Sequence, residues 1–172
     1  MSTGPGTTRL FLALWPEPGV RHALSAWRDA WSWPKSAAPV PTPKLHVTLH
    51  FLGNQPGDSV EALADGLAVP FTPFELALGR PVLWPHGIAV LEPHTEPESL
   101  LQLHAALGDA LLTLGLEPEA RKFRPHVTLA RRAGNVAPPL AGPPINWDVR
   151  GYALVESRPG HGGVYNVLRH YS

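Results

Sequence analysis

Two short stretches of the chain share the tetrapeptide His-Val-Thr-Leu, and in both of them apolar and polar positions alternate. The copies lie at 46–49 and 126–129. Alternate residues of a β-strand point to the same face. Each copy therefore predicts a strand with its histidine and threonine on one face and its valine and leucine on the other. We expect the strands to span residues 45–52 and 126–131, and to bring two imidazoles and two hydroxyls into one groove.

Further strands and helices are predicted on either side of the motifs. Apolar runs bounded by turn residues indicate strands at 8–15, 74–78, 88–91, 149–156 and 164–168. Apolar residues at helical spacing indicate two long helices, with Val20, Leu24, Trp27 and Trp31 in the first and Leu100, His104, Leu107, Leu111 and Leu114 in the second. Asp58 with Glu61, and Thr95 with Glu98, have the spacing of capping boxes, and Gly115 is expected to end the second long helix.

This order of elements favours an α+β fold with internal pseudo-symmetry. Each half supplies a helix before its motif strand, strands outnumber helices, and hairpin-like turns alternate with helical crossovers. The combination disfavours a doubly wound parallel sheet. We expect one domain over residues 1–172, with one motif in each of two lobes. The chain contains no glycine-rich phosphate loop of the Walker or dinucleotide-binding type.

Composition limits the classes of protein to which the chain can belong. Its 172 residues, 44% of them hydrophobic, are enough for a buried core, and no apolar run approaches the roughly 20 residues of a membrane span. The N-terminal residues lack the basic segment and cleavage site of a signal peptide. The absence of cysteine excludes disulfides and thiolate metal sites and fits a cytoplasmic protein. We therefore expect no membrane partner.

Charge is balanced over the whole chain but not around the second motif. Fourteen basic and fourteen acidic residues give a net charge of zero, so the overall field does not indicate a nucleic-acid partner. Five of the fourteen basic residues nevertheless flank His126: Arg121, Lys122, Arg124, Arg131 and Arg132. These side chains form either a solvated charged face or a binding surface for an anion.

The repeated His-x-Thr pattern suits phosphoryl chemistry. A lone strand histidine is more often structural than catalytic, but two copies of His and Thr on a core face would be poor choices for packing. An imidazole has an ordinary pKa of about 6.5, so one copy can accept a proton from water while the other donates one to a leaving oxygen. The threonine hydroxyls can donate to phosphate oxygens, and Arg131, which has no equivalent in the first copy, can bind them bidentately.

Five segments of the chain together carry a family resemblance. They are Arg9-Leu10-Phe11 with Ala13, residues 45–53 (LHVTLHFLG), residues 123–131 (FRPHVTLAR), Glu156-Ser157-Arg158, and Gly162-Gly163-Val164-Tyr165. In these segments the sequence resembles the two-histidine (2H) phosphoesterases, and among them the bacterial RNA 2′,3′-cyclic phosphodiesterases once called 2′-5′ RNA ligases. The resemblance covers nearly the whole chain. It implies a bilobal, pseudo-symmetric α+β fold of antiparallel sheets flanked by helices, with both histidines in a central groove.

The resemblance also implies roles for individual residues. His46 is expected to be the proton donor to the ribose O3′, and His126 the proton acceptor from water, which would leave a 2′-phosphate on the product. The residues expected to bind the phosphate or the nucleoside are Thr48, Thr128 and Arg131 for the phosphate, and Phe11 and Phe51 for the nucleoside.

Strict alternation conflicts with part of this assignment. It places Phe51 on the face of Val47 and Leu49, so core packing is the favoured interpretation and contact with a nucleoside would need a bulge or the end of the strand. It places His50 on the face of His46, where the second copy has an alanine. His50 is expected to line the mouth of the groove or, alternatively, to contact RNA.

The expected substrate is an RNA with a 2′,3′-cyclic phosphate end or a small cyclic nucleotide, acted on by a monomer without cofactor or metal. A zinc site is disfavoured because the chain has no cysteine and the acids nearest to the motifs are Asp58 and Glu119. Two alternatives stay open. One is another 2H activity, such as 2′-5′ RNA ligation or cleavage or the hydrolysis of a small cyclic nucleotide. The other is a non-catalytic RNA-end binder.

Overall fold

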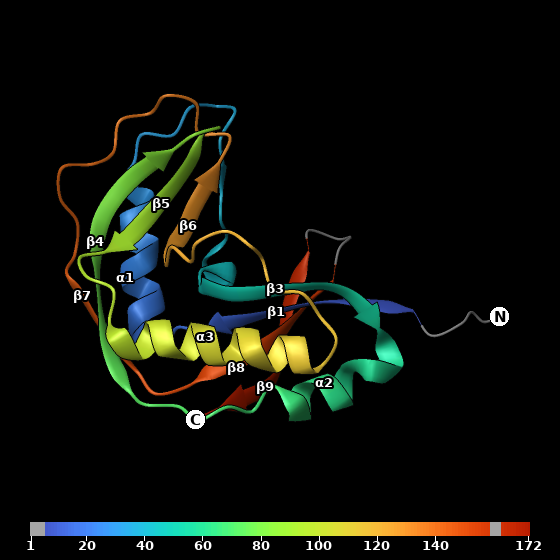
Figure 1. Cartoon of the computed structure of the whole chain (residues 1–172). Helices are drawn as coiled ribbons and strands as arrows, with labels where there is room; N and C mark the ends of the chain where they lie inside the picture. The colour runs from blue at the N-terminus through green and yellow to red at the C-terminus, as the bar shows by residue number, and fades with distance from the viewer. Residues whose placement is uncertain (1–5, 159–162) are drawn as a thin grey trace.

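The computed structural model describes residues 6–158 and 163–172, whose strands form a curled antiparallel sheet (Figure 1). Gly162, part of the last family segment, lies outside the described residues. The strands are β1 (Thr7–Leu14), β2 (Ala38–Pro39), β3 (Val47–Pro56), β4 (Phe74–Trp84), β5 (Ile88–Pro93), β6 (Val127–Arg131), β7 (Ile145–Val149), β8 (Tyr152–Arg158) and β9 (Val164–Tyr171). The helices are α1 (Pro18–Asp29), α2 (Val60–Gly66) and α3 (Glu98–Thr113), with 3-10 turns at Thr42–Lys44 and Gly57–Ser59.

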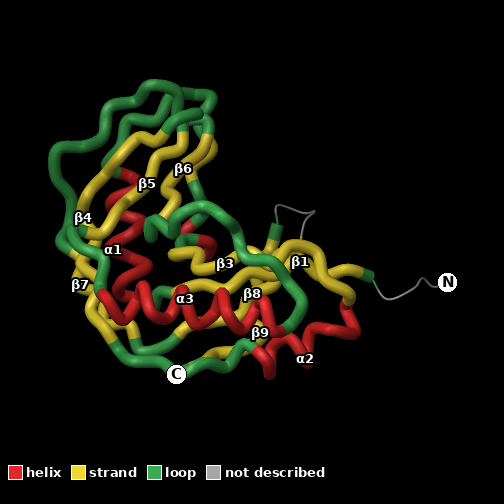
Figure 2. Tube along the Cα trace, in the orientation of Figure 1, coloured by secondary structure: helices red, strands yellow, loops and turns green. Residues whose placement is uncertain are grey.

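The sheet consists of two halves that meet at the motif strands. Its order is β7-β4-β5-β6-β3-β1-β8-β9, with the short β2 paired to β6. Strands β3 and β6 are joined through one residue pair, Val47 opposite Val127, whereas their pairings with β1 and β5 run over several residues. Figure 2 shows the half that contains β4, β5 and β6 rising from the half that contains β3, β1 and β8. The two motifs therefore lie at the junction of the halves.

The two halves repeat the same order of elements. One half contains β1, α1 and β3 in this order, with the short β2 and a 3-10 turn before β3, and the other contains β5, α3 and β6. In each half the first strand is the sheet neighbour of the motif strand. The helices cross between the halves, because α1 contacts β6 and β7 while α3 contacts β3 (Figure 1). The pseudo-symmetric α+β fold with antiparallel strands, which the sequence predicted, is confirmed.

The apolar residues of the motifs belong to the core. Val47, Leu49, Val127 and Leu129 are all buried, as alternation predicts for the valine and leucine of each copy. They pack in one cluster with apolar residues of the sheet and of the crossing helices, among them Leu10, Leu12, Leu24, Leu100, Leu107 and Leu111. The opposite face of each motif strand carries the histidine and the threonine and is not part of this core.

Most predicted elements are present, but the two capping boxes are not. Helix α2 begins after Ser59 and α3 begins after Pro97, and neither start has a side-chain cap hydrogen bond. Asp58 is taken up by a 3-10 turn, and Pro97 sets the backbone at the start of α3, so Thr95 lies too far upstream to cap it. The sequence also missed β7 as a separate strand and the extension of β4 to its end at residue 84.

The end of α3 agrees with prediction. Gly115 has a φ of 82°, and the N–H of Leu116 donates to the carbonyl oxygen of Leu111 at 2.9 Å. This is the Schellman arrangement, in which a left-handed glycine satisfies carbonyls of the last helical turn. It releases the chain into the 116–126 segment, which leads across the sheet to the second motif.

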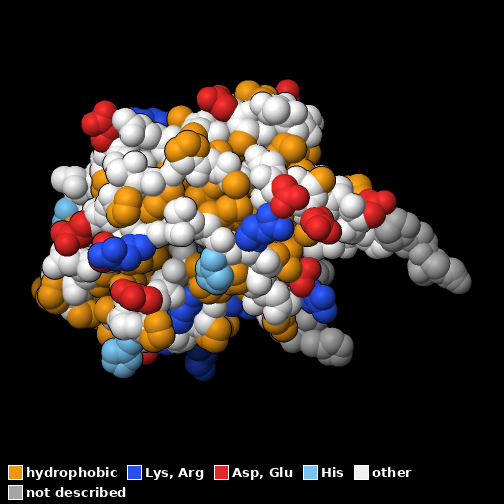
Figure 3. Space-filling view, turned by 90° about the horizontal axis from the view of Figure 1, so that it is seen from below, with side chains coloured by type: hydrophobic (Ala, Val, Ile, Leu, Met, Phe, Trp, Pro, Cys, Tyr) orange, Lys and Arg blue, Asp and Glu red, His pale blue; other side chains and the backbone are white. Residues whose placement is uncertain are grey.

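The surface carries charges of both signs. On the face shown in Figure 3, acidic, basic and apolar side chains are interspersed, in keeping with the zero net charge of the chain. Among the helices of the described residues, none is long and apolar enough to cross a membrane.

Candidate active site

The first motif strand carries a register shift immediately after its threonine. Against β1, Thr48 is opposite Ala13 and His50 is opposite Leu12, so Leu49 has no partner residue. A bulge of this kind turns the following residues to the other face of the strand. Phe51 thereby joins the face of Thr48, where its side chain is 54% exposed. The preferred sequence interpretation, that Phe51 packs in the core, is wrong for this reason.

The second motif strand carries the same shift at the matching position. Against β5, Thr128 is opposite Val90 and Ala130 is opposite Ala89, so Leu129 has no partner residue. Arg131 is exposed as a result, whereas strict alternation would have turned it toward the core. The two bulges place Phe51 in one half and Arg131 in the other at equivalent positions beside the site.

Both motif histidines are oriented by the same backbone contact. The Nδ1–H of His46 donates to the carbonyl oxygen of Lys44 at 2.7 Å, and the Nδ1–H of His126 donates to that of Arg124, also at 2.7 Å. A carbonyl can only accept, so Nδ1 carries the proton of each neutral ring and Nε2 is its free basic nitrogen. The hydroxyl of Thr48 donates to Nε2 of His46 at 2.8 Å.

Aromatic rings surround His46. Phe11 lies 4.9 Å from it between ring centroids, Trp15 stacks on it at 5.8 Å with the ring planes inclined by 29°, and Tyr165 meets it edge-on at 5.7 Å. Burial and, to a smaller extent, nearby positive charges lower the pKa of His46 to about 4, against the opposing effect of the hydrogen bond to the Lys44 carbonyl. The free protein therefore holds His46 neutral at pH 7. Sequence reasoning found Phe11 and Tyr165 only through the family resemblance and missed Trp15, which is the residue after β1.

His126 has a different neighbourhood. The ring of Trp84, at the end of β4, lies 4.3 Å from the imidazole between centroids. Burial lowers the pKa of His126, the carbonyl of Arg124 opposes this shift, and so does the carboxylate of Glu92. Neither Trp84 nor Glu92 was identified from sequence, because each reaches His126 only through the pairing of strands.

The phosphate-binding candidates lie at the same junction. Thr48 and Thr128 are both half-buried on the face of the histidines. Arg131 lies within electrostatic range of both imidazoles, since its positive charge lowers the pKa of His46 and of His126. The structure thus brings together the two histidines and Arg131, from opposite halves of the sheet.

A hollow of about 260 Å³ adjoins the histidine of the second motif. Its lining includes residues from both halves and from the 116–126 segment: Thr48, Phe51, Trp84, His126, Arg121, Lys122 and Arg124. Three of the five basic residues noted around the second motif therefore face this hollow, although Arg121 is also paired with Glu119 at 2.7 Å. Exposed aromatic and cationic side chains here could contact a base and its phosphates.

Phe11 is placed beneath the site rather than open to a ligand. Its side chain is 3% exposed and packs with Ala13, Ala153 and Val155, under the ring of His46. Phe51 lies 6.3 Å away between centroids and is the accessible ring of the pair. Of the two phenylalanines expected to contact the nucleoside, Phe51 is accessible to a ligand, whereas Phe11 is buried and packs against His46.

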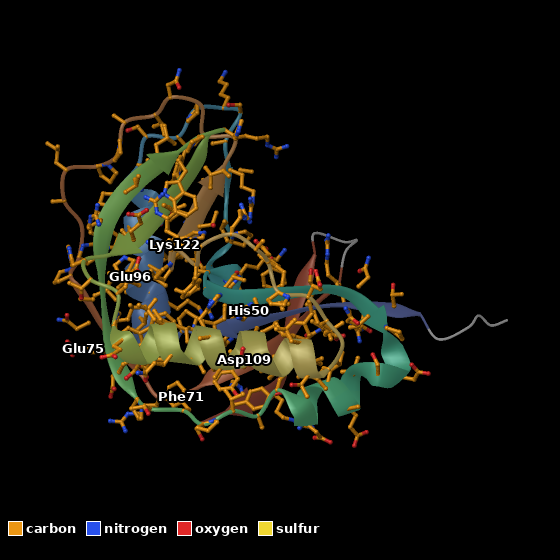
Figure 4. All side chains as sticks on the ribbon, viewed as in Figure 1. His50, Phe71, Glu75, Glu96, Asp109 and Lys122 are labelled. Atoms are coloured by element: carbon orange, nitrogen blue, oxygen red, sulfur yellow. The ribbon has the colours of Figure 1, made fainter. Side chains whose placement is uncertain are left out.

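His50 was expected to line the mouth of the groove or to contact RNA, and it does line the hollow beside His126, although from a buried position. The bulge at Leu49 turns it inward, where it is 5% exposed and lies between β3 and α3 (Figure 4). It stacks on His104 at 4.0 Å between centroids, and its Nε2–H donates to the backbone carbonyl of His104 at 2.8 Å. His104 in turn stacks on Phe123 at 3.9 Å. This three-ring stack fixes the 116–126 segment, which carries the basic lining of the hollow, against α3 and β3.

Among the described residues, no group of three or more His, Asp or Glu side chains is arranged to hold a metal ion. At the junction the motifs supply two imidazoles, two hydroxyls and a guanidinium. Together these groups can move protons and neutralise a phosphate.

Comparison with known proteins gives consistent matches. The family model described as the 2′-5′ RNA ligase superfamily matches residues 16–160. An RNA 2′,3′-cyclic phosphodiesterase of Thermus thermophilus is 34% identical over 95% of this chain and 89% of its own, and one of Escherichia coli is 32% identical over 86% and 83%. The crystal structure of E. coli LigT complexed with 3′-AMP superposes with a TM-score of 0.86 at 28% identity, and covers 95% of this chain and 97% of its own.

Proposed function

The chain belongs to the 2′-5′ RNA ligase superfamily, and from this premise we propose that it hydrolyses the 2′,3′-cyclic phosphate at the end of an RNA to a 2′-phosphate. The curated relatives of T. thermophilus and E. coli are both RNA 2′,3′-cyclic phosphodiesterases. The observation that carries the proposal is the pseudo-symmetric pair of imidazoles at the sheet junction. Both present Nε2 to the site, and Arg131 acts on both.

In the proposed reaction water attacks phosphorus as the bond from phosphorus to O3′ breaks. His126 Nε2 accepts a proton from the water, and His46 Nε2 donates one to O3′, so the transfers balance. The hydroxyls of Thr48 and Thr128 and the guanidinium of Arg131 bind the non-bridging oxygens and offset the charge that develops there. The chain supplies proton transfer and charge stabilisation without a metal or cofactor.

The protonation states of the free protein suit this division of work. An imidazole whose pKa is lowered, as in His46, is a strong proton donor once it is charged. His46 is neutral in the free protein and accepts the Thr48 hydroxyl hydrogen bond. Binding of the anionic phosphate favours its protonated form and offers the Thr48 hydroxyl a new acceptor.

For the nucleoside we propose contact with Phe51 rather than with Phe11. The exposed ring of Phe51 lines the hollow beside His126, together with Trp84 and the basic residues of the 116–126 segment. Aromatic stacking is tolerant of base identity, so this contact suits an RNA end without strong sequence preference.

The residues proposed for catalysis all come from one chain, which supports a monomer as the active unit. The lack of cysteine suits the reducing cytoplasm. A single species of about 18.6 kDa by light scattering after gel filtration would support the monomer, and a stable dimer would contradict it.

The decisive experiment is incubation with a short RNA that ends in a 2′,3′-cyclic phosphate, followed by ³¹P NMR of the product. We expect a 2′-phosphomonoester, formed at the same rate after exhaustive EDTA treatment. Binding without turnover would leave the non-catalytic RNA-end binder. A 2′-5′ phosphodiester formed with a 5′-hydroxyl RNA would indicate ligation, and activity that EDTA removes and a divalent metal restores would contradict the two-histidine mechanism.

A further inference from the structure

Glu92, on β5, is a buried carboxylate that the proposed reaction does not use. Its side chain is 6% exposed. Its Oε2 accepts a hydrogen bond from the indole Nε1–H of Trp84 at 2.9 Å and lies 2.7 Å from the guanidinium of Arg124. Arg80, opposite it on β4, lies 3.8 Å from Oε1. Such a carboxylate is tolerated because its oxygens are paired, but its pairing alone does not explain its place beside a catalytic histidine.

Both principal partners of Glu92 are also the principal contacts of His126. Trp84 lies against the imidazole at 4.3 Å between ring centroids, and the backbone carbonyl of Arg124 accepts its Nδ1–H at 2.7 Å. The guanidinium of Arg124 lies over the Trp84 ring at 4.7 Å. Glu92 thus closes a ring of contacts through Trp84, His126 and Arg124.

The first motif has the same supports without the carboxylate. His46 has the carbonyl of Lys44, the ring of Trp15 and, 4.9 Å from that ring, the guanidinium of Arg21. Arg21, however, donates to the backbone carbonyls of Thr42 and Leu45, whereas Arg124 is paired with the carboxylate of Glu92. Glu92 therefore makes the electrostatic surroundings of His126 different from those of His46.

We infer that Glu92 is a positioning residue for His126, which holds Trp84 and Arg124 against the ring and stabilises the imidazolium formed when His126 takes a proton from water. The inference rests on the proposed function, in which His126 is the base. Glu92 does not reach the substrate, and the proton taken from water resides on Nε2 of His126. Its contribution should consequently appear in kcat rather than in KM.

The direct test is Glu92→Gln, which keeps an oxygen acceptor for Trp84 but removes the charge. We expect NMR titration of the imidazole resonances to give a lower pKa for His126 than in the wild type, with that of His46 unchanged. We expect kcat to fall about tenfold, which corresponds to about 1.4 kcal/mol of transition-state stabilisation, with little change in KM. The matched control is Glu156→Gln on β8, which removes another buried carboxylate, paired with Arg158, and should leave the His126 titration unchanged.

The other charges that face this pair are the same in both variants. They are Arg80 on β4, Arg124 before β6, Arg131 on β6 and His46 before β3. A difference between the two variants therefore reports the charge of Glu92. Wild-type titration and kcat in Glu92→Gln would overturn the inference.

A measurement on the wild type decides the matter if Glu92→Gln fails to fold. The side-chain carboxyl ¹³C resonance of Glu92 should shift as the pH passes through the pKa of His126, because protonation of the imidazole alters the field at the carboxylate. A resonance that does not respond over that range would overturn the inference. The titrations need no turnover, so failure of the proposed function would appear separately, as an inactive wild type.

Discussion

Val47 and Val127, the same position of the two His-Val-Thr-Leu motifs, lie opposite each other where the halves of the sheet meet. His46 and His126 each immediately precede one of these valines, so the pairing sets both imidazoles at the junction. The bulges at Leu49 and Leu129 follow two residues later and turn Phe51 and Arg131 toward the same site. The sheet thus builds a nearly two-fold site from strands eighty residues apart in sequence.

His46→Ala and His126→Ala should each reduce kcat on an RNA 2′,3′-cyclic phosphate by about 10²–10⁴-fold, the usual contribution of a general acid or base. The double variant should be little slower than either single variant, because both groups act on one displacement. Steady-state kinetics with circular dichroism as a check on folding would measure this. His22→Ala, at an exposed position on α1, is the control. Near-wild-type kcat in either single variant would refute the paired assignment.

The position of the phosphate in the product tests the direction of proton transfer. If His46 protonates O3′, that oxygen leaves and the product carries a 2′-phosphate. We expect ³¹P NMR to show one 2′-phosphomonoester. A 3′-phosphate would mean that the two histidines have exchanged roles or that the substrate binds in the opposite sense.

The sequence allowed the two motif strands and their polar faces to be predicted because the alternation of period two is local. The bulges could not be predicted in this way. The shift at Leu49 is defined by the pairing of His50 with Leu12 and of Thr48 with Ala13, and no residue within the motif itself indicates it. Its consequences reach function, since it moves Phe51 to the site and His50 into the interior.

The residues that contact His126 from other strands also could not be predicted from local sequence patterns. Trp84 and Glu92 belong to a hairpin that precedes the second motif by more than thirty residues, and only the order of the sheet brings them to His126. The prediction of the two capping boxes was wrong for a related reason. The pattern of residues was correct, but a 3-10 turn and Pro97 moved the helix starts.

Arg131→Lys should not be a conservative change if the guanidinium binds the phosphate bidentately. We expect kcat/KM to fall by the equivalent of about 1–3 kcal/mol, the range for hydrogen bonds to charged groups. Arg132→Lys, next along the chain and exposed, is the matched control and should keep wild-type kinetics. Equal kinetics in the two variants would place Arg131 on a solvated face outside the site.

The ring stack of His50, His104 and Phe123 should make stability depend on pH. Burial lowers the pKa of His104 to about 4, below the ordinary value of an unfolded histidine. The unfolded chain therefore binds more protons between about pH 6.5 and pH 4, and the contribution of His104 to stability is present above this range and lost as pH falls through it.

His104→Phe keeps a stacking ring but cannot titrate. Urea unfolding at pH 7 and pH 5 should show a smaller loss of stability on acidification in His104→Phe than in the wild type. Equal losses would contradict the buried neutral state of His104.

The pH dependence of catalysis should differ between the free protein and the complex. The reaction needs a proton on His46 and none on His126. In the free protein burial lowers the pKa of both, that of His46 to about 4, so kcat/KM should be highest on the acidic side of the ordinary histidine range and fall as pH rises.

A bound phosphate places negative charge beside His46 and raises its pKa, which keeps the donor protonated to higher pH. The basic limb of kcat should therefore lie at higher pH than that of kcat/KM, since the first reports the complex and the second the free enzyme. NMR titration of His46 with and without adenosine 2′-phosphate would measure the same shift directly. Basic limbs that coincide, together with a His46 titration that the nucleotide leaves unchanged, would show that His46 does not face the phosphate.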